Sequence, residues 1–255
     1  MYSLHDLRRR ACGHIPQYPL LSPPPTMTLP TSSRGSVTTI AQKFYKAPLP
    51  PVILEFVELT SLTAKSVMDL IATLGGGTRL GIAASYGEKC VLDTLAFSTE
   101  TRVLLIMMNG NAKGAHRQKQ ILTDALLCET TLEKHGFFME RIAASLYLDL
   151  GLLIRNAFDI ISAGDRRGSM AAYKGILVRA QTQLSLNESA VEKTFAEQPF
   201  ILSRKDDFAL RAWACHVGVQ GFPDPQGVID TSTKNTKVSP DRQSCLAFIS
   251  DCSTQ

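Results

Sequence analysis

Residues 126–165 constrain the fold of this chain most, because apolar periodicity and turn signals agree over the whole stretch. Residues 134–138 have the pattern of a short buried strand, and residues 139–150 that of an amphipathic helix. The apolar face of this helix carries residues four positions apart: Ile142, Leu146 and Leu150. Gly151 ends the helix, and residues 156–161 look like the start of a second one. A strand that leads into a helix, followed by glycine and another apolar segment, predicts an α/β fold.

The segments on either side extend this α/β pattern. Strands are expected at residues 52–59, 79–86, 90–98 and 103–108, the last three joined by short turns as an antiparallel meander. Helices are expected at residues 61–74, 120–129, 170–186, 187–196 and 205–219. The glycines at 75–77 follow a helix and precede a strand, which is the reverse of the order in a phosphate-binding loop. This layout predicts an α/β, ribonuclease H-like mixed sheet (an antiparallel meander plus parallel strands) flanked by helices.

One domain accounts for most of the 255 residues. Residues 1–49 form a Pro/Ser-rich lead that we expect to be disordered, because such composition buries too little apolar surface to offset the entropy of ordering. Residues 50–223 are expected to form the folded domain. From residue 224 to 255 the chain is again mostly polar, and we expect a disordered tail.

Composition and cysteine spacing limit the binding partners and the cellular compartments that we expect for the protein. The formal net charge of +4 permits contact with nucleic acid without requiring it. The six cysteines form no CxxC pair, and Cys90, Cys128 and Cys215 lie in apolar segments, so we expect free buried thiols in a reducing, intracellular compartment, either cytoplasmic or nuclear. No apolar run reaches the roughly 18 residues of a membrane span. A mitochondrial presequence is a weaker alternative, since Asp6 and the early prolines oppose it.

Several runs, taken in order, resemble the RNase D-like 3′–5′ exonuclease domain of the DEDD superfamily. They are VILEFVELTSLTAKSVMDLIATL, RLGIAAS, CVLDTLAFSTETRVLLI, EKHGFFMERIAASLYLDLGLLIRNAFDI and FAEQPFILSRKDDFALRAWACHV. The resemblance covers residues 52–219, roughly two thirds of the 255 residues. The spacing through Leu146, Gly151, Leu153, Asn156 and Asp159 fits the family without gaps. It implies a domain in which four carboxylates hold two divalent ions for in-line phosphoryl displacement.

None of these four carboxylates is present at the positions to which the resemblance assigns them. The Asp and Glu of the family's first strand fall at Ala83 and Ser85, and the Asp on the first turn of the central helix falls at Ile142. The last Asp falls at His216. The strand end before the central helix carries Phe138, and Ala212 stands where the family has a Tyr or another general base. The family's structural Asp is retained at Asp159. The resemblance therefore implies a degenerate site without catalysis and without a bound metal.

Other acids offer an alternative site. Asp93 lies on the neighbouring strand, and Glu140 lies on the first turn of the central helix but points about 200° away from Ile142. Asp206 and Asp207 precede the His216 position by more than two helical turns. Each is more typical of a solvated surface charge. His216 could bind a metal ion or a phosphate, but a buried, hydrogen-bonded histidine is the more typical interpretation.

Basic residues in expected loops could contact phosphates. They are Lys113, Arg117, Lys119, Arg166 and Arg167, with His116 beside them. The first hypothesis is a catalytically inactive exonuclease-like domain that binds single-stranded RNA or DNA, or a protein partner, and needs no cofactor. The alternative is an active exonuclease with displaced ligands, for which Mg²⁺ or Mn²⁺ would be required. A third hypothesis is a decayed paralogue without a partner. The sequence indicates neither a membrane contact nor an oligomeric state.

Overall fold

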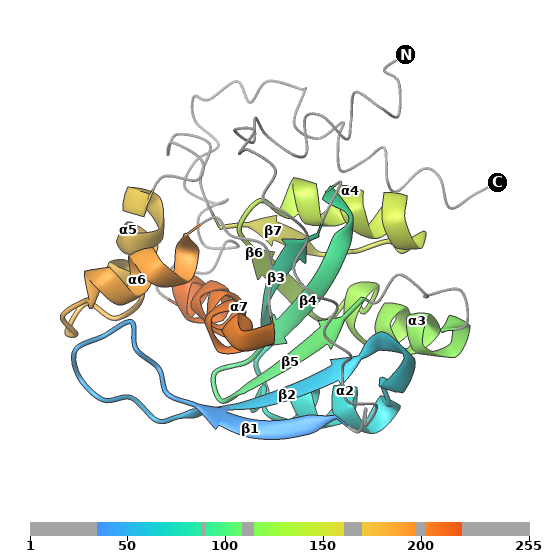
Figure 1. Cartoon of the computed structure of the whole chain (residues 1–255), viewed down its shortest axis with the longest axis horizontal. Helices are drawn as coiled ribbons and strands as arrows, with labels where there is room; N and C mark the ends of the chain where they lie inside the picture. Colours follow the sequence, from blue (N-terminus) through green and yellow to red (C-terminus); the bar gives the residue numbers. More distant parts are fainter. Residues whose placement is uncertain (1–34, 88–89, 109–114, 161–169, 197–201, 221–255) are drawn as a thin grey trace, which may run out of the picture.

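The computed structural model describes residues 35–87, 90–108, 115–160, 170–196 and 202–220. Across these residues the chain forms a seven-stranded sheet with the strand order β1-β2-β5-β4-β3-β6-β7 (Figure 1). The strands are β1 (Ser36–Ile40), β2 (Val52–Glu58), β3 (Arg79–Tyr86), β4 (Leu92–Ser98), β5 (Arg102–Met107), β6 (Glu133–Gly136) and β7 (Ala157–Asp159).

The sheet is mixed, as the sequence predicts. Strands β3, β4 and β5 pair as an antiparallel meander. Strand β6 then runs parallel to β3 at its free side, and β7 runs parallel to β6. On the far side β2 is parallel to β5, and β1 is antiparallel to β2. A three-strand meander continued by parallel strands beside its first strand is the ribonuclease H-like arrangement, so the predicted fold class is confirmed.

Helices cover both faces of the sheet because alternate strand residues point to opposite sides. One apolar cluster contains Leu80 and Ile82 of β3 and packs under α2 (Ala64–Ala72), α3 (His116–Leu122) and α4 (Met139–Leu150). The other contains Ala83 of β3 and packs under α5 (Met170–Ala180), α6 (Glu188–Phe195) and α7 (Lys205–Gln220). A π-helical turn, Thr123–Leu127, follows α3.

Local signals fix several boundaries. The expected strand at 79–86 and the expected helix at 139–150 coincide with β3 and α4. Gly151 adopts φ 69°, and its N–H donates to the Tyr147 carbonyl at 2.9 Å, so the glycine closes α4 in the left-handed conformation that it tolerates best. The glycine triplet joins α2 to β3, and Gly75 and Gly76 have positive φ angles, as a helix end requires.

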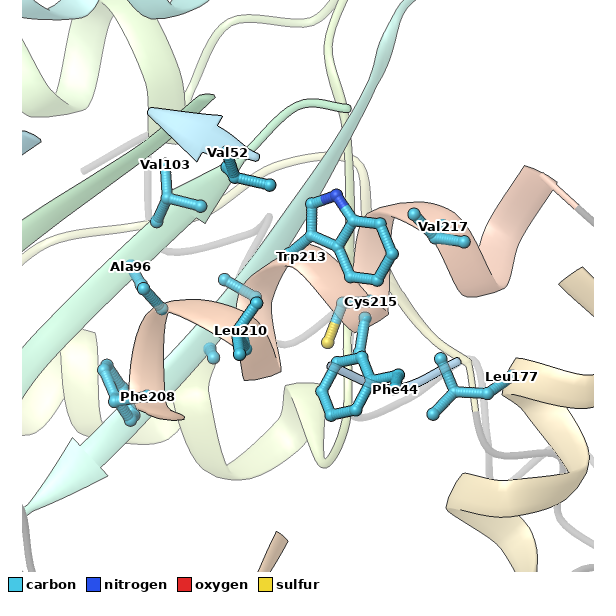
Figure 2. Close-up of a cluster of buried hydrophobic side chains, with 14 of the residues drawn as sticks. Phe44, Val52, Ala96, Val103, Leu177, Phe208, Leu210, Trp213, Cys215 and Val217 are labelled. Atoms are coloured by element: carbon cyan, nitrogen blue, oxygen red, sulfur yellow. The ribbon is translucent and has the colours of Figure 1, made fainter. Parts of the chain in front are cut away.

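The expected disordered lead is wrong for residues 35–49. Ser36–Ile40 is strand β1, and Phe44 and Tyr45 are 0% and 4% exposed. Phe44 stacks on Trp213 of α7, with ring centroids 5.9 Å apart, and Figure 2 shows both side chains in one buried cluster. Tyr45 also forms a bridge to Leu186. The folded domain therefore begins before residue 50, while residues 1–34 and the expected tail at 224–255 lie outside the described ranges.

The expected helix start at 156–161 is also wrong. Ala157–Asp159 forms strand β7, in register with Lys134–Gly136 of β6. Asn156 adopts φ 48°, which no helical residue has, and its side-chain amide donates to the Thr130 carbonyl. Pairing with a strand more than twenty residues away overrides the local apolar pattern, and a three-residue strand is too short to show its own periodicity.

The cysteines depart from expectation at one position. Cys128 and Cys215 are free, and Cys215 is fully buried. Cys90 is joined in a disulfide, so the prediction of a free thiol is wrong there. The predicted reducing compartment therefore has no support from Cys90. Within the described ranges, no helix is both long and apolar enough to cross a membrane.

Candidate functional site

The first-strand positions of the candidate site lie on β3, under α7. Ala83 and Ser85 are 8% and 6% exposed, and they pair with Ala96 and Thr94 of β4. Because they are two residues apart, both point to the same face of the sheet. Ala83 belongs to the apolar cluster under α5, α6 and α7. A methyl group and a hydroxyl group therefore stand where the resemblance implies two carboxylates.

Phe138 and Ile142 lie at the start of α4. Phe138 is the residue before the helix and adopts φ 58° and ψ 49°, with no side-chain cap. Its carbonyl accepts the N–H of Ile142 at 3.2 Å. Ile142 is 3% exposed and belongs to the apolar cluster on the opposite face from Ala83. At this position the helix presents hydrocarbon to a packed core, where no metal ion fits.

Asp159 explains how this helix start is held. Its Oδ2 accepts a hydrogen bond from the Met139 N–H, at 3.3 Å, across from β7. A carboxylate at the first turn of a helix satisfies an otherwise unpaired donor and interacts favourably with the helix dipole. The retained acid thus has the structural role that the resemblance assigns to it.

Ala212 and His216 lie on α7 where it crosses Gly81. A Cβ atom at Gly81 would come within 2.1 Å of the Ala212 carbonyl oxygen and 2.5 Å of the His216 backbone nitrogen, so glycine is what permits this close approach. The His216 ring continues to the amino end of β3, where Nδ1 lies 3.1 Å from the Arg79 carbonyl oxygen. Arg79 and Ser85 are about 20 Å apart along the strand.

The structure therefore brings only part of the assigned set together: Ala83 and Ala212 share the cluster under α5, α6 and α7, and Phe138 packs against it. Ala83 and Ser85 occupy the α7 face of β3 towards its carboxyl end, and Ile142 lies in the core of the opposite face. His216 projects towards the amino end of the same strand. The spacing in α7 could not reveal this, because the level at which a helix crosses a strand depends on packing between distant segments.

His216 is a buried histidine with hydrogen-bond partners. It is 7% exposed, and burial lowers its pKa to about 4, although the bond to Arg79 opposes that shift. Because Nδ1 donates to a carbonyl oxygen, Nε2 accepts from the Gln220 side-chain amide at 3.1 Å. His135 of β6 is 5% exposed, and burial also lowers its pKa against a hydrogen bond to Glu133. Both rings are neutral near pH 7, as the more typical interpretation of His216 expects.

The alternative acids are dispersed. Asp93 accepts a hydrogen bond from Thr94 at 3.2 Å, and Glu140 is exposed on the first turn of α4. Asp206 and Asp207 lie in the first turn of α7, and Asp207 is bound by Lys43 and Arg204. Burial would raise the Asp207 pKa, but these two cations outweigh it and hold the pKa below its usual value. Among the described residues, no three His, Cys, Asp or Glu side chains are grouped to hold a metal ion.

Two of the five predicted phosphate contacts fall in described segments. Arg117 is exposed on α3. Lys119 is half-buried, and its Nζ donates to the Leu150 carbonyl at 3.3 Å, so it caps the end of α4. His116 is the exposed first residue of α3. Lys113, Arg166 and Arg167 lie outside the described residues.

Sequence reasoning missed an aromatic cluster at the end of β6. Phe137 meets Tyr173 and Phe195 edge-on, with ring centroids 4.7 and 5.4 Å away. Tyr173 and Phe195 stack on each other at 4.3 Å, and Phe195 continues to Phe44 at 6.0 Å. These rings join β6, α5, α6 and the segment after β1 into one apolar layer. Apart from Phe137 at a strand end, the sequence gives no signal that these separated residues meet.

Comparison with solved structures finds an RNase D, an EXD2 exonuclease domain and the catalytic core of RRP6 at low similarity. A Trypanosoma brucei RNase D in complex with GMP is 10% identical over 72% of this chain and 58% of that chain, with a TM-score of 0.42. An EXD2 exonuclease domain soaked in Mn and dGMP is 16% identical over 78% and 83% of the two chains, with a TM-score of 0.35. The catalytic core of RRP6 from Trypanosoma brucei is 17% identical over 70% and 49%, with a TM-score of 0.40. No family model and no curated protein matches the chain.

Proposed function

We propose that this chain is a 3′–5′ exonuclease-like domain that binds nucleic acid, RNA foremost, without cleaving it. The observation that carries the proposal is the lack of a carboxylate at the four assigned positions. Ala83 and Ile142 place hydrocarbon in the two apolar cores, Ser85 carries a hydroxyl group, and His216 is a neutral, buried imidazole. Two-metal hydrolysis requires oxygen ligands around both ions. The residues at these positions do not fit such ions, so no hydrolytic step is assigned to them.

A nuclease assay tests the absence of catalysis. Single-stranded RNA and DNA with a 5′ label are incubated with the full chain in Mg²⁺ or Mn²⁺, and shortening from the 3′ end is followed on a gel. We expect the same rate for the wild type and for a Phe138→Ala/His216→Ala double variant. Faster shortening by the wild type would contradict the proposal. If Asp93→Asn or Glu140→Gln then abolished this activity, the alternative of an exonuclease with displaced ligands would hold instead.

Salt dependence tests the binding role and separates nucleic acid from a protein partner. A contact to phosphates releases counterions, so the logarithm of the affinity for a single-stranded RNA falls linearly with the logarithm of salt concentration. Among the predicted contacts that the structure describes, Arg117 is the exposed cation, and we expect Arg117→Ala to reduce that slope by about 0.7. Lys65→Ala is the matched control, because Lys65 is exposed on α2 and already pairs with Asp69 at 2.8 Å. Failure to bind RNA at low salt would favour a protein partner.

A further inference from the structure

Among the strands that the structure describes, β1 forms an edge of the sheet. It pairs with β2 on one side, and the described residues place no strand on its other side. Figure 1 shows β1 along the border of the sheet, with no described helix or strand beyond it. Four of its five residues are exposed, and Val37 is 62% exposed. Beside it on β2, Ile53 is 36% exposed. An edge of this kind presents unpaired backbone donors and acceptors.

Two features that commonly protect such an edge, charge and proline, are absent from β1 itself. Its sequence, Ser-Val-Thr-Thr-Ile, contains neither a charged residue nor proline. The opposite edge, β7, is only three residues long and carries Asp159, whose carboxylate is tied to the start of α4. Charges, prolines and short length are the common means by which proteins prevent pairing at sheet edges. Over the described residues, the sheet therefore has one short, acid-bearing edge and one longer, neutral edge.

We propose that β1 pairs with β1 of a second copy of this chain, antiparallel and centred on Thr38, so that the two sheets become continuous across a twofold axis. In this register Thr38 faces Thr38 of the second copy, Val37 faces Thr39, and Ser36 faces Ile40. Threonine pairs and apolar–threonine pairs across strands are favourable, and no like charges face each other. The nearest buried charge, Glu55 opposite Val37 on β2, is neutralised by Arg102 at 2.6 Å.

The second copy is the occupant that this edge fits best, because the strand is self-complementary in charge and in side-chain type. A partner carrying lysine or glutamate would find no counter-charge on β1 itself. A five-residue strand is about 17 Å long, so the contact is small. We therefore expect a reversible dimer that dissociates on dilution. This inference does not depend on whether the domain binds nucleic acid.

Charge complementation tests the proposal. Thr38→Lys and Thr38→Glu each place like charges against each other at the twofold axis. Each should raise the dimer dissociation constant at least about fivefold. The constant is measured by sedimentation equilibrium at chain concentrations from about 1 to 300 µM. An equimolar mixture of the two variants should recover the wild-type dissociation constant, because lysine then faces glutamate. Val178→Lys and Val178→Glu, on the exposed face of α5, are the matched controls.

Each outcome decides the proposal. Recovery in the mixture supports it, and also shows that both variants are folded. A wild-type chain that stays monomeric over the whole series overturns it. Dimers that persist in both Thr38 variants would place the contact on another surface. Two monomeric variants that fail to associate when mixed, while retaining the wild-type melting temperature, would exclude pairing between the two β1 strands.

Discussion

Single side chains in this domain have charge states set by burial, and His216 is the clearest case. Its ring lies between the amino end of β3 and the last turn of α7, where it bonds to Arg79 and Gln220. Protonation would convert Nε2 from an acceptor into a donor that faces the donor amide of Gln220. It would also place a positive charge near Arg79 and His135, both of which already disfavour the charged ring. The neutral ring is therefore part of how α7 is attached to the sheet.

We expect the stability of the domain to fall in acid, partly through His216. The pKa of His216 is about 4 in the folded chain and near 6.5 when unfolded, so the unfolded chain binds more protons between these values and stability falls as pH drops from 6.5 to 4. His216→Gln removes this titration but keeps a donor for the Arg79 carbonyl. Over that window the wild type should lose on the order of 2 kcal/mol more than the variant in urea unfolding. Equal losses of unfolding free energy in the wild type and the variant would show that His216 does not contribute to the pH dependence of stability.

Lys134 gives a pH dependence of the same sign, in a more alkaline window. It is fully buried, and Nζ donates to the carbonyls of Glu129 and Leu132 at 2.5 and 2.8 Å. Burial lowers its pKa to about 8 from 10.5, so the unfolded chain binds more protons between these values. This group therefore adds stability as pH rises through that window. Compared with Lys134→Met, the wild type should gain on the order of 2 kcal/mol between pH 7.5 and pH 10. A difference that does not change with pH would contradict the lowered pKa.

Among the elements, those with strong local signals were predicted and those made by distant pairing were not. Strand β3 and helix α4 carry clear periodicity and a glycine stop, so their bounds followed from sequence. Strands β1 and β7 exist because β2 and β6 provide hydrogen-bond partners, and their own residues show little alternation. The same holds for the candidate site. The residue types at its positions were assigned from sequence, but the sequence did not predict which end of β3 the His216 ring would contact.

The start of α4 is stabilised by Asp159, a residue that lies outside the helix, and this contact can be tested. Asp159→Asn removes the charge that meets the Met139 N–H and the helix dipole. We expect a loss of about 1 kcal/mol in the free energy of unfolding, with little change in overall helix content. Glu100→Gln, at an exposed acid in the turn between β4 and β5, is the control and should change the free energy of unfolding by less than about 0.5 kcal/mol. Equal changes in the free energy of unfolding for the two variants would contradict the capping role of Asp159.

At the scale of the whole molecule, the segment after β1 ties the helical layer to the sheet. Phe44 contacts the rings of Phe195 and Trp213, the Asn187 N–H donates to the Phe44 carbonyl at 2.7 Å, and Tyr45 Oη donates to the Leu177 carbonyl at 2.9 Å. One short segment thus connects α5, α6 and α7. Because it closes the apolar layer over the face that holds Ala83, the same packing completes the fold and fills the region above the candidate site.

Phe44→Ala therefore tests whether residues 35–49 belong to the cooperative unit. Phe44 is fully buried, so its truncation should lower the free energy of unfolding by about 3–5 kcal/mol, through lost burial and the cavity left behind. Met68→Ala, at a side chain that is 60% exposed on α2, should change it by less than about 0.5 kcal/mol. Urea unfolding followed by Trp213 fluorescence and by circular dichroism should give one shared transition in the wild type. A near-neutral Phe44→Ala would mean that the aromatic layer is stable without this segment.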